Sequence, residues 1–212
     1  MAIIFDNDGT LIDSSHVHSS IESELLRKYG ARISTQELEL RYSGMSLKDI
    51  FEEVNKEHEL SCSFDTFLAE KITLLEQHIP SIQVVQGVHA LLDELDKQAI
   101  PYAIASGGRR EYIDNVLEST GLSRRIPVSV SAWEVANGKP APDVFLEAAK
   151  RLGVQPTSCV VVEDGRSGMI GAKKGGMKVI GIGKEHKDFA DAVVESFADI
   201  TIDLIRNVAR NK

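Results

Sequence analysis

The stretch AIIFDNDGTLID, residues 2–13, sets the organisation of the whole chain. Its first four residues form an unbroken apolar run, which is typical of a strand buried on both faces of a parallel sheet. Three carboxylates, those of Asp6, Asp8 and Asp13, follow within eight residues, although like charges this close together repel one another. Because ligands bind at the carboxyl ends of the strands in open parallel sheets, we expect Asp6 and Asp8 to face a ligand. Asp13 is expected to have a structural role in the turn that follows.

Four further apolar runs resemble this first strand, and each is followed by glycine or polar residues and then a helical pattern. They are YAIA at 102–105, VSVS at 128–131, CVVV at 159–162 and KVIGI at 178–182. A strand followed by a helix, repeated along a chain, indicates a parallel sheet with helices on both faces. We therefore predict an α/β protein with a Rossmann-like parallel sheet as its core.

The interval between the first two strands is too long for a simple crossover. Residues 15–84 show only helical periodicity, in which Ile21, Leu25 and Leu26 share one face of a helix, and further apolar sets follow. We predict an inserted all-helical domain at residues 15–84, and a core domain formed by residues 1–14 and 85–212.

The composition of the 212-residue chain restricts its partners. With 42% hydrophobic residues it can bury a full core, and its net charge of −8 disfavours nonspecific attraction to nucleic acid or anionic lipid. No stretch approaches the roughly 20 apolar residues that span a bilayer, and the first residues lack the pattern of a secretory signal. We expect a cytoplasmic protein without nucleic-acid or membrane partners. Cys62 and Cys159 form neither a disulfide framework nor a metal-binding spacing, and nothing requires more than a monomer.

Polar side chains follow the predicted strands at the points where the strands end. Because these ends meet at one edge of a parallel sheet, the side chains form one chemical set. A lysine in the loop NGKPAPD, after the third predicted strand, joins them. The set consists of Asp6, Asp8, Ser106, Gly107, Gly108, Lys139, Glu163 and Asp164.

Asp6, Asp8 and Asp164 cannot all stay ionised in one crevice unless a positive charge compensates them. A hard divalent cation does so, and Mg²⁺ takes one or two carboxylates and leaves its remaining positions to water and phosphate. The set has neither histidine nor thiol, which argues against zinc. Lys139 adds a second positive charge. With the Ser106 hydroxyl and the glycine amides, it would stabilise the charge of a phosphoryl group in transfer.

The motif FDNDGTLIDS resembles the first motif of the haloacid dehalogenase superfamily. Three further motifs follow in the family's order: a strand that ends in serine (AIAS, Ser106), a lysine loop (GKPAPDVF, Lys139) and an acidic pair after a strand (VVVEDGRSG, Glu163 and Asp164). The position of the helical insert resembles that of the superfamily's small α-helical cap. Four ordered motifs are a specific signal, whereas each of them alone would be weak.

The resemblance implies a role for each acidic residue. Asp6 would be the nucleophile, which attacks phosphorus and forms an aspartyl phosphate. Asp8 would protonate the departing ester oxygen and then deprotonate the incoming water. The backbone carbonyl of Asp8 and the carboxylates of Asp6 and Asp164 would bind Mg²⁺. Glu163 would be either a further ligand or a group that orients the ligands.

Candidate substrate contacts follow from the same resemblance. His18 is similar in position to a histidine that the β-phosphoglucomutases of this superfamily use in their cap. Those mutases also carry an arginine shortly after a Gly-x-Ser, where this chain has GMSLKD with Leu47 in that place. Lys71, on the last predicted helix of the insert, is a further candidate. So is Gly107, at which many relatives place serine or asparagine. Trp133 is expected to pack against its neighbours rather than to contact substrate.

These observations predict a magnesium-dependent phosphatase that hydrolyses a small phosphorylated metabolite, a sugar or polyol phosphate. The alternative is a β-phosphoglucomutase-like enzyme that passes the phosphoryl group to another sugar hydroxyl; His18 favours it and Leu47 argues against it. Dehalogenase activity is disfavoured by Asp8, because those relatives lack this acid and base. A phosphonate-cleaving enzyme would need a cap lysine suited to an imine. A non-catalytic phosphate-binding module predicts the loss of a motif residue, and none is missing.

Overall fold

The computed structural model describes residues 1–42 and 45–210 of the chain. The chain divides into two compact units, of which one consists of Met1–Asp13 and Gln83–Lys212 and the other of Ser14–Ile82. We call them the core unit and the helical unit. Gly44, the first residue of the GMSLKD stretch, lies outside the described residues.

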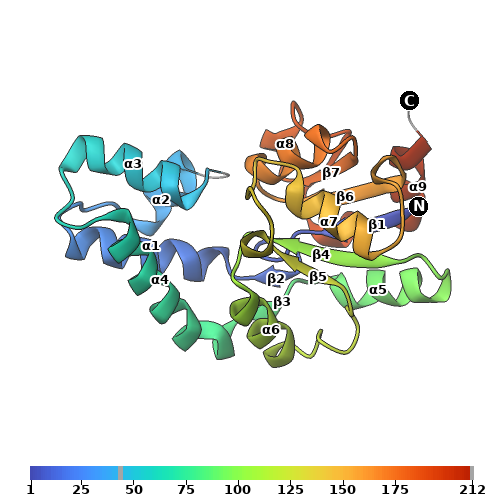
Figure 1. The fold of residues 1–212 in the computed structure, drawn as a ribbon, viewed down its shortest axis with the longest axis horizontal. Helices are drawn as coiled ribbons and strands as arrows, with labels where there is room; N and C mark the ends of the chain where they lie inside the picture. Colours follow the sequence, from blue (N-terminus) through green and yellow to red (C-terminus); the bar gives the residue numbers. More distant parts are fainter. Residues whose placement is uncertain (43–44, 211–212) are drawn as a thin grey trace. The chain divides into compact units, whose positions relative to one another are not determined.

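A six-stranded parallel sheet forms the centre of the core unit (Figure 1). In the order in which they lie side by side, the strands are β5 (Ser129–Ser131), β4 (Tyr102–Ser106), β1 (Ala2–Phe5), β6 (Cys159–Glu163), β7 (Lys178–Ile182) and β8 (Ala192–Val194). The chain therefore adds strands first on one side of β1 and then on the other. The carboxyl end of β1 is consequently a topological switch point, the place at which open sheets of this kind bind ligands.

The predicted α/β class with a Rossmann-like parallel sheet is confirmed, and strands are present at all five predicted places. The sequence analysis missed β8. This edge strand has three residues, of which only Val194 is buried, so its apolar run is too short to stand out.

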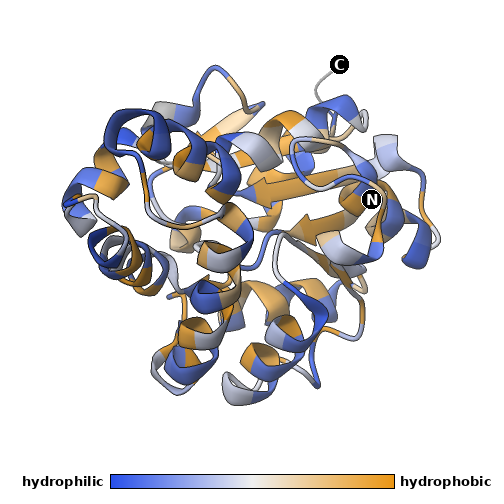
Figure 2. Cartoon of the chain, turned by 60° about the vertical axis from the view of Figure 1, so that its left-hand side comes forward, coloured by the Kyte–Doolittle hydropathy of each residue, from blue (hydrophilic) through white to orange (hydrophobic). Residues whose placement is uncertain are grey.

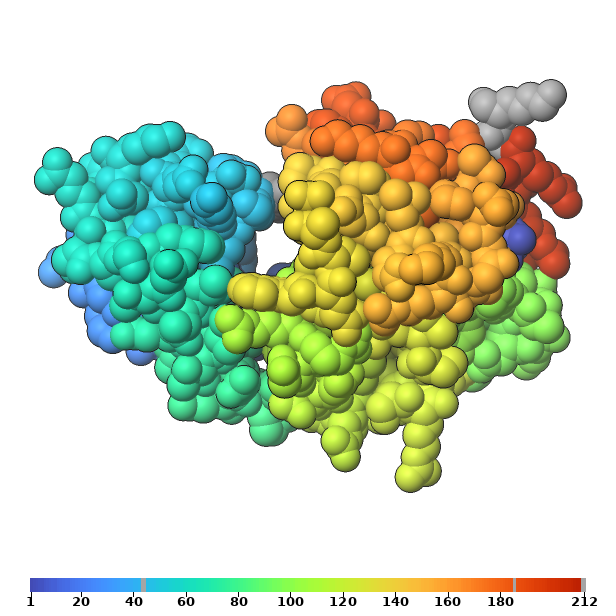
Figure 3. All heavy atoms as spheres, viewed as in Figure 1, coloured from blue at the N-terminus to red at the C-terminus, as the bar shows by residue number. Residues whose placement is uncertain are grey.

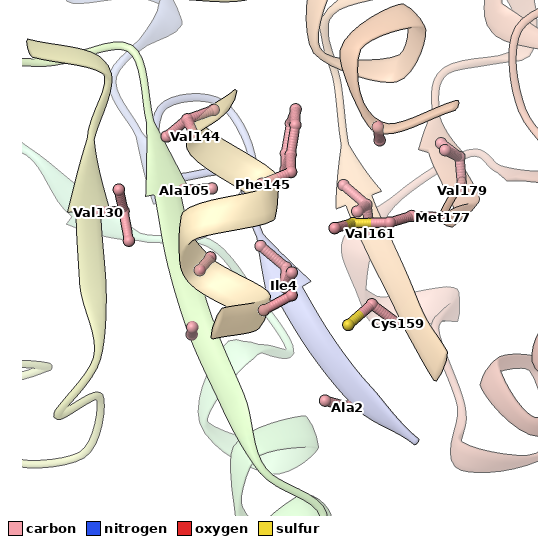
Figure 4. Close-up of a cluster of buried hydrophobic side chains, with 14 of the residues drawn as sticks. Ala2, Ile4, Ala105, Val130, Val144, Phe145, Cys159, Val161, Met177 and Val179 are labelled. Carbon is pink, nitrogen blue, oxygen red and sulfur yellow. The ribbon is translucent and has the colours of Figure 1, made fainter. Parts of the chain in front are cut away.

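One face of the sheet is covered by α7 (Asp143–Arg151) and α8 (Arg166–Lys174). Successive side chains of a strand point to opposite faces, so Ala2 and Ile4 of β1 both lie on this face. Figure 4 shows Ile4 in the same buried cluster as Phe145 of α7. In the space-filling view of Figure 3, the yellow-orange atoms of α7 form the surface in front of the sheet.

Three other helices of the core unit are α5 (Val88–Lys97), α6 (Arg110–Ser119) and α9 (Ile202–Arg210). Helix α9 packs on β6 and β7 and also against α5, while α6 packs on β5. The ring of Phe5 in β1 lies 6.4 Å from Tyr102 and 5.9 Å from Phe197 between ring centroids. The strands are mainly hydrophobic and the helices are striped, as expected of helices with one buried side (Figure 2). Short 3₁₀ turns lie at Ile79–Ser81, Ala132–Glu134, Pro156–Ser158, Lys184–His186 and Phe197–Asp199.

In its described residues, the helical unit contains four α-helices, three of which start at a capping serine. They are α1 (Ser15–Lys28), α2 (Thr35–Arg41), α3 (Leu47–His58) and α4 (Phe64–His78). Helices α2, α3 and α4 each begin after a serine, Ser34, Ser46 or Ser63, whose side chain accepts a backbone N–H of the first turn. Such a cap satisfies an N–H that has no partner within the helix, and it contributes about 1 kcal/mol.

The interior of the helical unit is partly aromatic. The ring of Phe51 lies 5.5 Å from that of Phe64 and 5.3 Å from that of Phe67. Beside this apolar packing lies a buried ion pair between Lys71 of α4 and Glu22 of α1. The pair joins these two helices, which also pack against each other.

A second, two-stranded sheet lies where the chain leaves the core unit and returns to it. Strands β2 (Ile12–Asp13) and β3 (Gln83–Val84) are antiparallel, with Ile12 opposite Val84 and Asp13 opposite Gln83. The purely helical pattern expected up to residue 84 therefore ends earlier, because residues 83 and 84 are extended. In the part of the chain that the structure describes, none of the helices has the length and apolar character to cross a membrane.

Candidate active site

The turn after β1 presents Asp6 and Asp8 at the carboxyl edge of the sheet. The carbonyl of Asn7 accepts a hydrogen bond from the amide of Leu11 at 2.9 Å, which closes the turn. Gly9 has a φ of 80°, a left-handed conformation that glycine adopts without steric cost. The spacing of the DNDGT stretch thus places two carboxylates on one tight turn.

Lys139 joins Asp6 to Glu163. It comes from the loop between β5 and α7, and its Nζ lies 2.5 Å from Asp6 Oδ1 and 2.8 Å from Glu163 Oε2. The side chain of Lys139 is 10% exposed, and those of its two partners are buried more deeply. Charges removed from water to this extent are stable only when they are paired and hydrogen-bonded.

Burial and like charge shape the ionisation of this group. Burial first, and the Glu163 carboxylate second, raise the pKa of Asp6 well above its ordinary value, against the effect of Lys139. The same two causes raise the pKa of Asp164 to about 7. Burial alone would lower the pKa of Lys139, but the carboxylates of Asp6 and Glu163 outweigh it and raise that pKa, so the ammonium stays charged. The site therefore favours an additional positive charge.

Three carboxylates of the site can hold a metal ion. Asp6, Glu163 and Asp164 each offer one oxygen, and these oxygens lie within 4.8 Å of one another. Thr10 Oγ1 donates to Asp164 Oδ1 at 3.4 Å, and the Gly165 amide donates to Glu163 Oε1 at 3.1 Å, so both acidic side chains are oriented from outside the cluster. A donor set made only of hard oxygens fits Mg²⁺ and does not fit zinc.

Asp8 has a different set of partners. Its Oδ1 accepts a hydrogen bond from the hydroxyl of Tyr112 at 2.5 Å, and its Oδ2 accepts from Asn7 Nδ2 at 3.3 Å and from Ser106 Oγ at 3.5 Å. Ser106 Oγ in turn accepts from the Gly108 amide at 3.0 Å. The side chain of Asp8 is thus held by its neighbour Asn7, by Ser106 at the end of β4 and by Tyr112 of α6.

The structure brings together most of the residues predicted for the site. Lys139 and the carboxylates of Asp6 and Glu163 are in direct contact, Asp164 lies in the same oxygen cluster, and Ser106 contacts Asp8. What each of them does in a reaction stays a prediction.

The predicted substrate contacts come from both units. Gly107 is in the loop after β4, and a Cβ at that position would meet no heavy atom within 4 Å. His18 is on α1 and Lys71 on α4, both in the helical unit. Lys71 is buried, and its ammonium is paired with Glu22.

Trp133 corrects one expectation. The side chain was expected to pack, but 56% of the residue is exposed, and the guanidinium of Arg109 lies 4.4 Å from its ring centroid. The short turn Ala132–Glu134 carries the indole to the surface, and a tryptophan in a sequence gives no signal of this.

Two functional candidates, Thr10 and Tyr112, were missed by the sequence analysis. Thr10 looks like an ordinary turn residue, and Tyr112 has the spacing of a core residue, since it shares a buried face of α6 with Ile113 and Val116. The two adjacent glycines before α6 were a weak signal, because glycine often marks a close approach of another group.

Comparisons with known proteins agree with this geometry. The family model of the haloacid dehalogenase-like hydrolases matches residues 3–182. A bifunctional riboflavin kinase/FMN phosphatase of Arabidopsis thaliana is 33% identical over 95% of this chain, which spans about half (54%) of that protein. The validoxylamine A 7'-phosphate phosphatase of Streptomyces hygroscopicus is 29% identical over 91% of this chain and 89% of its own length. A β-phosphoglucomutase of Bacillus subtilis is 27% identical over 96% of this chain and 93% of its own.

Solved structures show the same fold. The crystal structure of a conserved haloacid dehalogenase-like protein of unknown function from Agrobacterium tumefaciens has a TM-score of 0.85 and 32% identity, and covers 99% of both chains. The chain belongs to the haloacid dehalogenase-like hydrolase family. It is an enzyme of the phosphomonoester hydrolase type, as the sequence motifs predicted.

Proposed function

We propose that the chain is a Mg²⁺-dependent phosphatase that hydrolyses a small phosphorylated metabolite, a sugar or polyol phosphate, through an aspartyl phosphate on Asp6. The observation that carries the proposal is the buried pairing of Lys139 with Asp6 and Glu163, beside a cluster of three carboxylate oxygens. The proposal includes a monomeric, cytoplasmic enzyme without nucleic-acid or membrane partners. In it, residues 1–14 and 85–212 are the core domain and residues 15–84 are a cap.

In the first step, a carboxylate oxygen of Asp6 attacks phosphorus and the bond from phosphorus to the ester oxygen breaks. Asp8 gives a proton to that oxygen, so the substrate leaves as an alcohol. Lys139 offsets part of the negative charge of the phosphoryl group as it is transferred. The hydroxyl of Ser106 and the amides of the loop after β4 are donors for the phosphoryl oxygens.

In the second step, Asp8 takes a proton from a water molecule, the water oxygen attacks phosphorus, and the bond to Asp6 breaks. Inorganic phosphate leaves and the carboxylate of Asp6 is restored. Asp6, Asp164 and the Asp8 carbonyl would bind Mg²⁺, and Glu163 would either bind it or orient its ligands. The ion would offset the negative charge that Lys139 alone leaves uncompensated.

The helical unit would supply the substrate contacts. His18 and Lys71 are the candidates there, and the open space beside Gly107 would accept part of the substrate. A mutase differs only in the second step, in which a sugar hydroxyl replaces water. The similarity to a β-phosphoglucomutase supports mutase activity as the second candidate function.

The test is a screen for phosphate release from sugar and polyol phosphates with Mg²⁺. We expect release with the wild type and a loss of about 10³-fold or more with Asp6→Asn. Asp13→Asn is a matched control, because it makes the same chemical change on an exposed residue of β2, and it should retain activity.

A parallel assay measures the interconversion of β-glucose 1-phosphate and glucose 6-phosphate with a bisphosphate primer. Rapid interconversion with little phosphate release would make the chain a mutase. Full turnover in Asp6→Asn would exclude the covalent mechanism for both functions.

A further inference from the structure

Tyr112 reaches the reaction centre from the first turn of α6. The residue is 5% exposed, and its hydroxyl donates to Asp8 Oδ1 at 2.5 Å, although the two residues are 104 positions apart. A buried phenol normally has a hydrogen-bond partner, and the bond is shorter and stronger when the acceptor is an ionised carboxylate. This contact is shorter than the two at Asp8 Oδ2, which measure 3.3 and 3.5 Å.

Gly108 makes this contact possible. A Cβ on Gly108 would lie 2.8 Å from Cδ1 of the Tyr112 ring and 3.3 Å from Ser106 Oγ. Cβ atoms do not approach other heavy atoms to 2.8 Å, so a larger residue at position 108 would displace the ring. The need is for space, since Gly108 is not among the glycines with a positive φ. The absence of a side chain at Gly108 therefore leaves the space that the Tyr112 ring needs to reach Asp8.

The hydrogen bond from Tyr112 fixes the orientation of the Asp8 carboxylate. With Oδ1 held by Tyr112, the carboxylate cannot rotate about its last bond without breaking this 2.5 Å hydrogen bond. Oδ2 then faces the Ser106 side, where the phosphoryl donors lie. A general acid must be within hydrogen-bond reach of the atom that it protonates, so this orientation bears directly on its efficiency.

We propose that Tyr112 is a positioning residue, whose hydroxyl holds Asp8 so that Oδ2 exchanges the proton with the substrate oxygen. The inference rests on the proposed function, in which Asp8 is the general acid. It assigns to Tyr112 a role that none of the four sequence motifs contains.

The experiment uses two substrates that differ in their need for an acid. Glycerol 3-phosphate releases an alkoxide, which must be protonated as it leaves, whereas p-nitrophenyl phosphate releases a stable phenolate. The quantity measured is kcat/KM, which reports the steps up to the first phosphoryl transfer. In Tyr112→Phe we expect a fall of about 10- to 100-fold for glycerol 3-phosphate, carried by kcat with KM unchanged. For p-nitrophenyl phosphate we expect less than about a threefold change.

Tyr102→Phe is the matched control. Tyr102 is 8% exposed, lies at the opposite end of β4, and donates its hydroxyl to Asp96 Oδ1 at 2.8 Å, so the change removes an equivalent tyrosine–aspartate bond away from the site. It should leave both substrates unaffected. Gly108→Ala keeps the Tyr112 hydroxyl but displaces its ring. Because its Cβ would also crowd Ser106 Oγ, we expect a fall with both substrates that is larger for glycerol 3-phosphate than for p-nitrophenyl phosphate. Gly108→Ala also serves as the second variant should Tyr112→Phe not fold.

Three outcomes overturn the inference. One is wild-type kinetics in Tyr112→Phe with both substrates. Another is an equal fall with both substrates, which shows only a general disturbance of the fold. The last is an absence of turnover in the wild type with every sugar and polyol phosphate of the screen, which overturns the proposed function and the inference with it. Normal turnover in the wild type, with its loss in Asp6→Asn and no selectivity in Tyr112→Phe, overturns the inference and leaves the proposed function intact.

Discussion

The carboxylate of Glu163 occupies the place that a side chain at Gly168 would take. A Cβ on Gly168 would lie 1.8 Å from Glu163 Oε2 and 2.2 Å from its Cδ. Gly168 is buried within α8, where glycine costs about 1 kcal/mol relative to alanine. The helix therefore contains a residue that is unfavourable for helix formation and that leaves room for an acidic side chain of the site.

Gly168→Ala should consequently impair the site in spite of its better helix propensity. The added methyl group would force the Glu163 carboxylate away from Lys139 and from the Gly165 amide. We expect phosphate release to fall at least about tenfold and the free energy of unfolding to fall by about 1–3 kcal/mol. Steady-state kinetics and urea unfolding measure the two effects. In a Glu163→Ala background the clash is absent, so adding Gly168→Ala should cost no further stability, while activity stays low. Equal stability of Gly168→Ala and the wild type would contradict this interpretation.

Removal of the metal should lower the stability of the protein. Burial, and then Glu163, raise the pKa of Asp164 to about 7, so below pH 7 the metal-free protein holds a proton there that Mg²⁺ must displace. We expect Mg²⁺ to raise the Tm of protein treated with a chelator, and to do so more at pH 8 than at pH 6. At 100 times its Kd the ion would add about 2.7 kcal/mol. Asp164→Asn should abolish the rise, and Asp13→Asn should preserve it. A rise that is the same at both pH values would show that no proton is displaced.

Removing only one charge of the buried pair of Lys71 and Glu22 should lower the stability of the protein. Both side chains are 10% exposed, and Lys71→Met leaves the carboxylate of Glu22 without its counter-charge. We expect a loss of about 3–5 kcal/mol in the free energy of unfolding. The double variant Glu22→Leu/Lys71→Met removes both charges and should recover most of the loss. Urea unfolding of the three proteins tests this, and a double variant as unstable as Lys71→Met would refute it.

The same double variant tests the predicted substrate contact. Because its fold is expected to be stable, a rise in KM for the substrate would reflect the missing ammonium itself. An unchanged KM would assign Lys71 to the structure of the helical unit alone.

The ion pairs of Glu134 should make the free energy of unfolding depend on pH in the acidic range. Its Oε1 lies 2.8 Å from Arg110 Nε, and its Oε2 lies 3.1 Å from Arg151 Nη2. The hydrogen bond from Arg110 is the main cause that lowers the pKa of Glu134 from 4.5 to about 2. A lowered pKa means that the folded state binds the proton less tightly than the unfolded state. The stabilisation is therefore complete above about pH 4.5 and is lost as the pH falls towards 2.

Glu134→Gln should accordingly cost about 1 kcal/mol at pH 7, since solvent screens these partly exposed charges. The difference from the wild type should shrink between pH 4.5 and pH 2. Urea unfolding at several pH values measures it, with Glu111→Gln, the same change at an exposed glutamate, as the control. A constant difference over this range would exclude the ion pairs as its cause.

Much of the core unit could be predicted because its strands are buried on both faces. A strand such as β6, with five buried residues in sequence, leaves a continuous apolar signal. Strands β2 and β3 have two residues each, and their pairing depends on where the chain returns after the helical unit. No local pattern of two residues carries that information, so both were missed.

The candidate site divides in the same way. Asp6, Glu163 and Ser106 could be identified because each stands at or directly after the end of a strand, a place that the sequence marks clearly. Tyr112 lies within a helix, where its spacing is that of a core residue, and only the three-dimensional approach to Asp8 distinguishes it. The sequence also contains no indication that the side chain of Trp133 is exposed.

The short antiparallel pair of β2 and β3 holds together the two points at which the backbone departs for the helical unit and comes back. Since these points are adjacent, the segment between them is an inserted module whose ends meet on one rigid ladder of the core. Such a module can be lengthened, shortened or exchanged in evolution while the register of the central strands is preserved. Under the proposed function, in which the helical unit contacts the substrate, the choice of substrate and the chemistry performed on it can therefore change independently of each other.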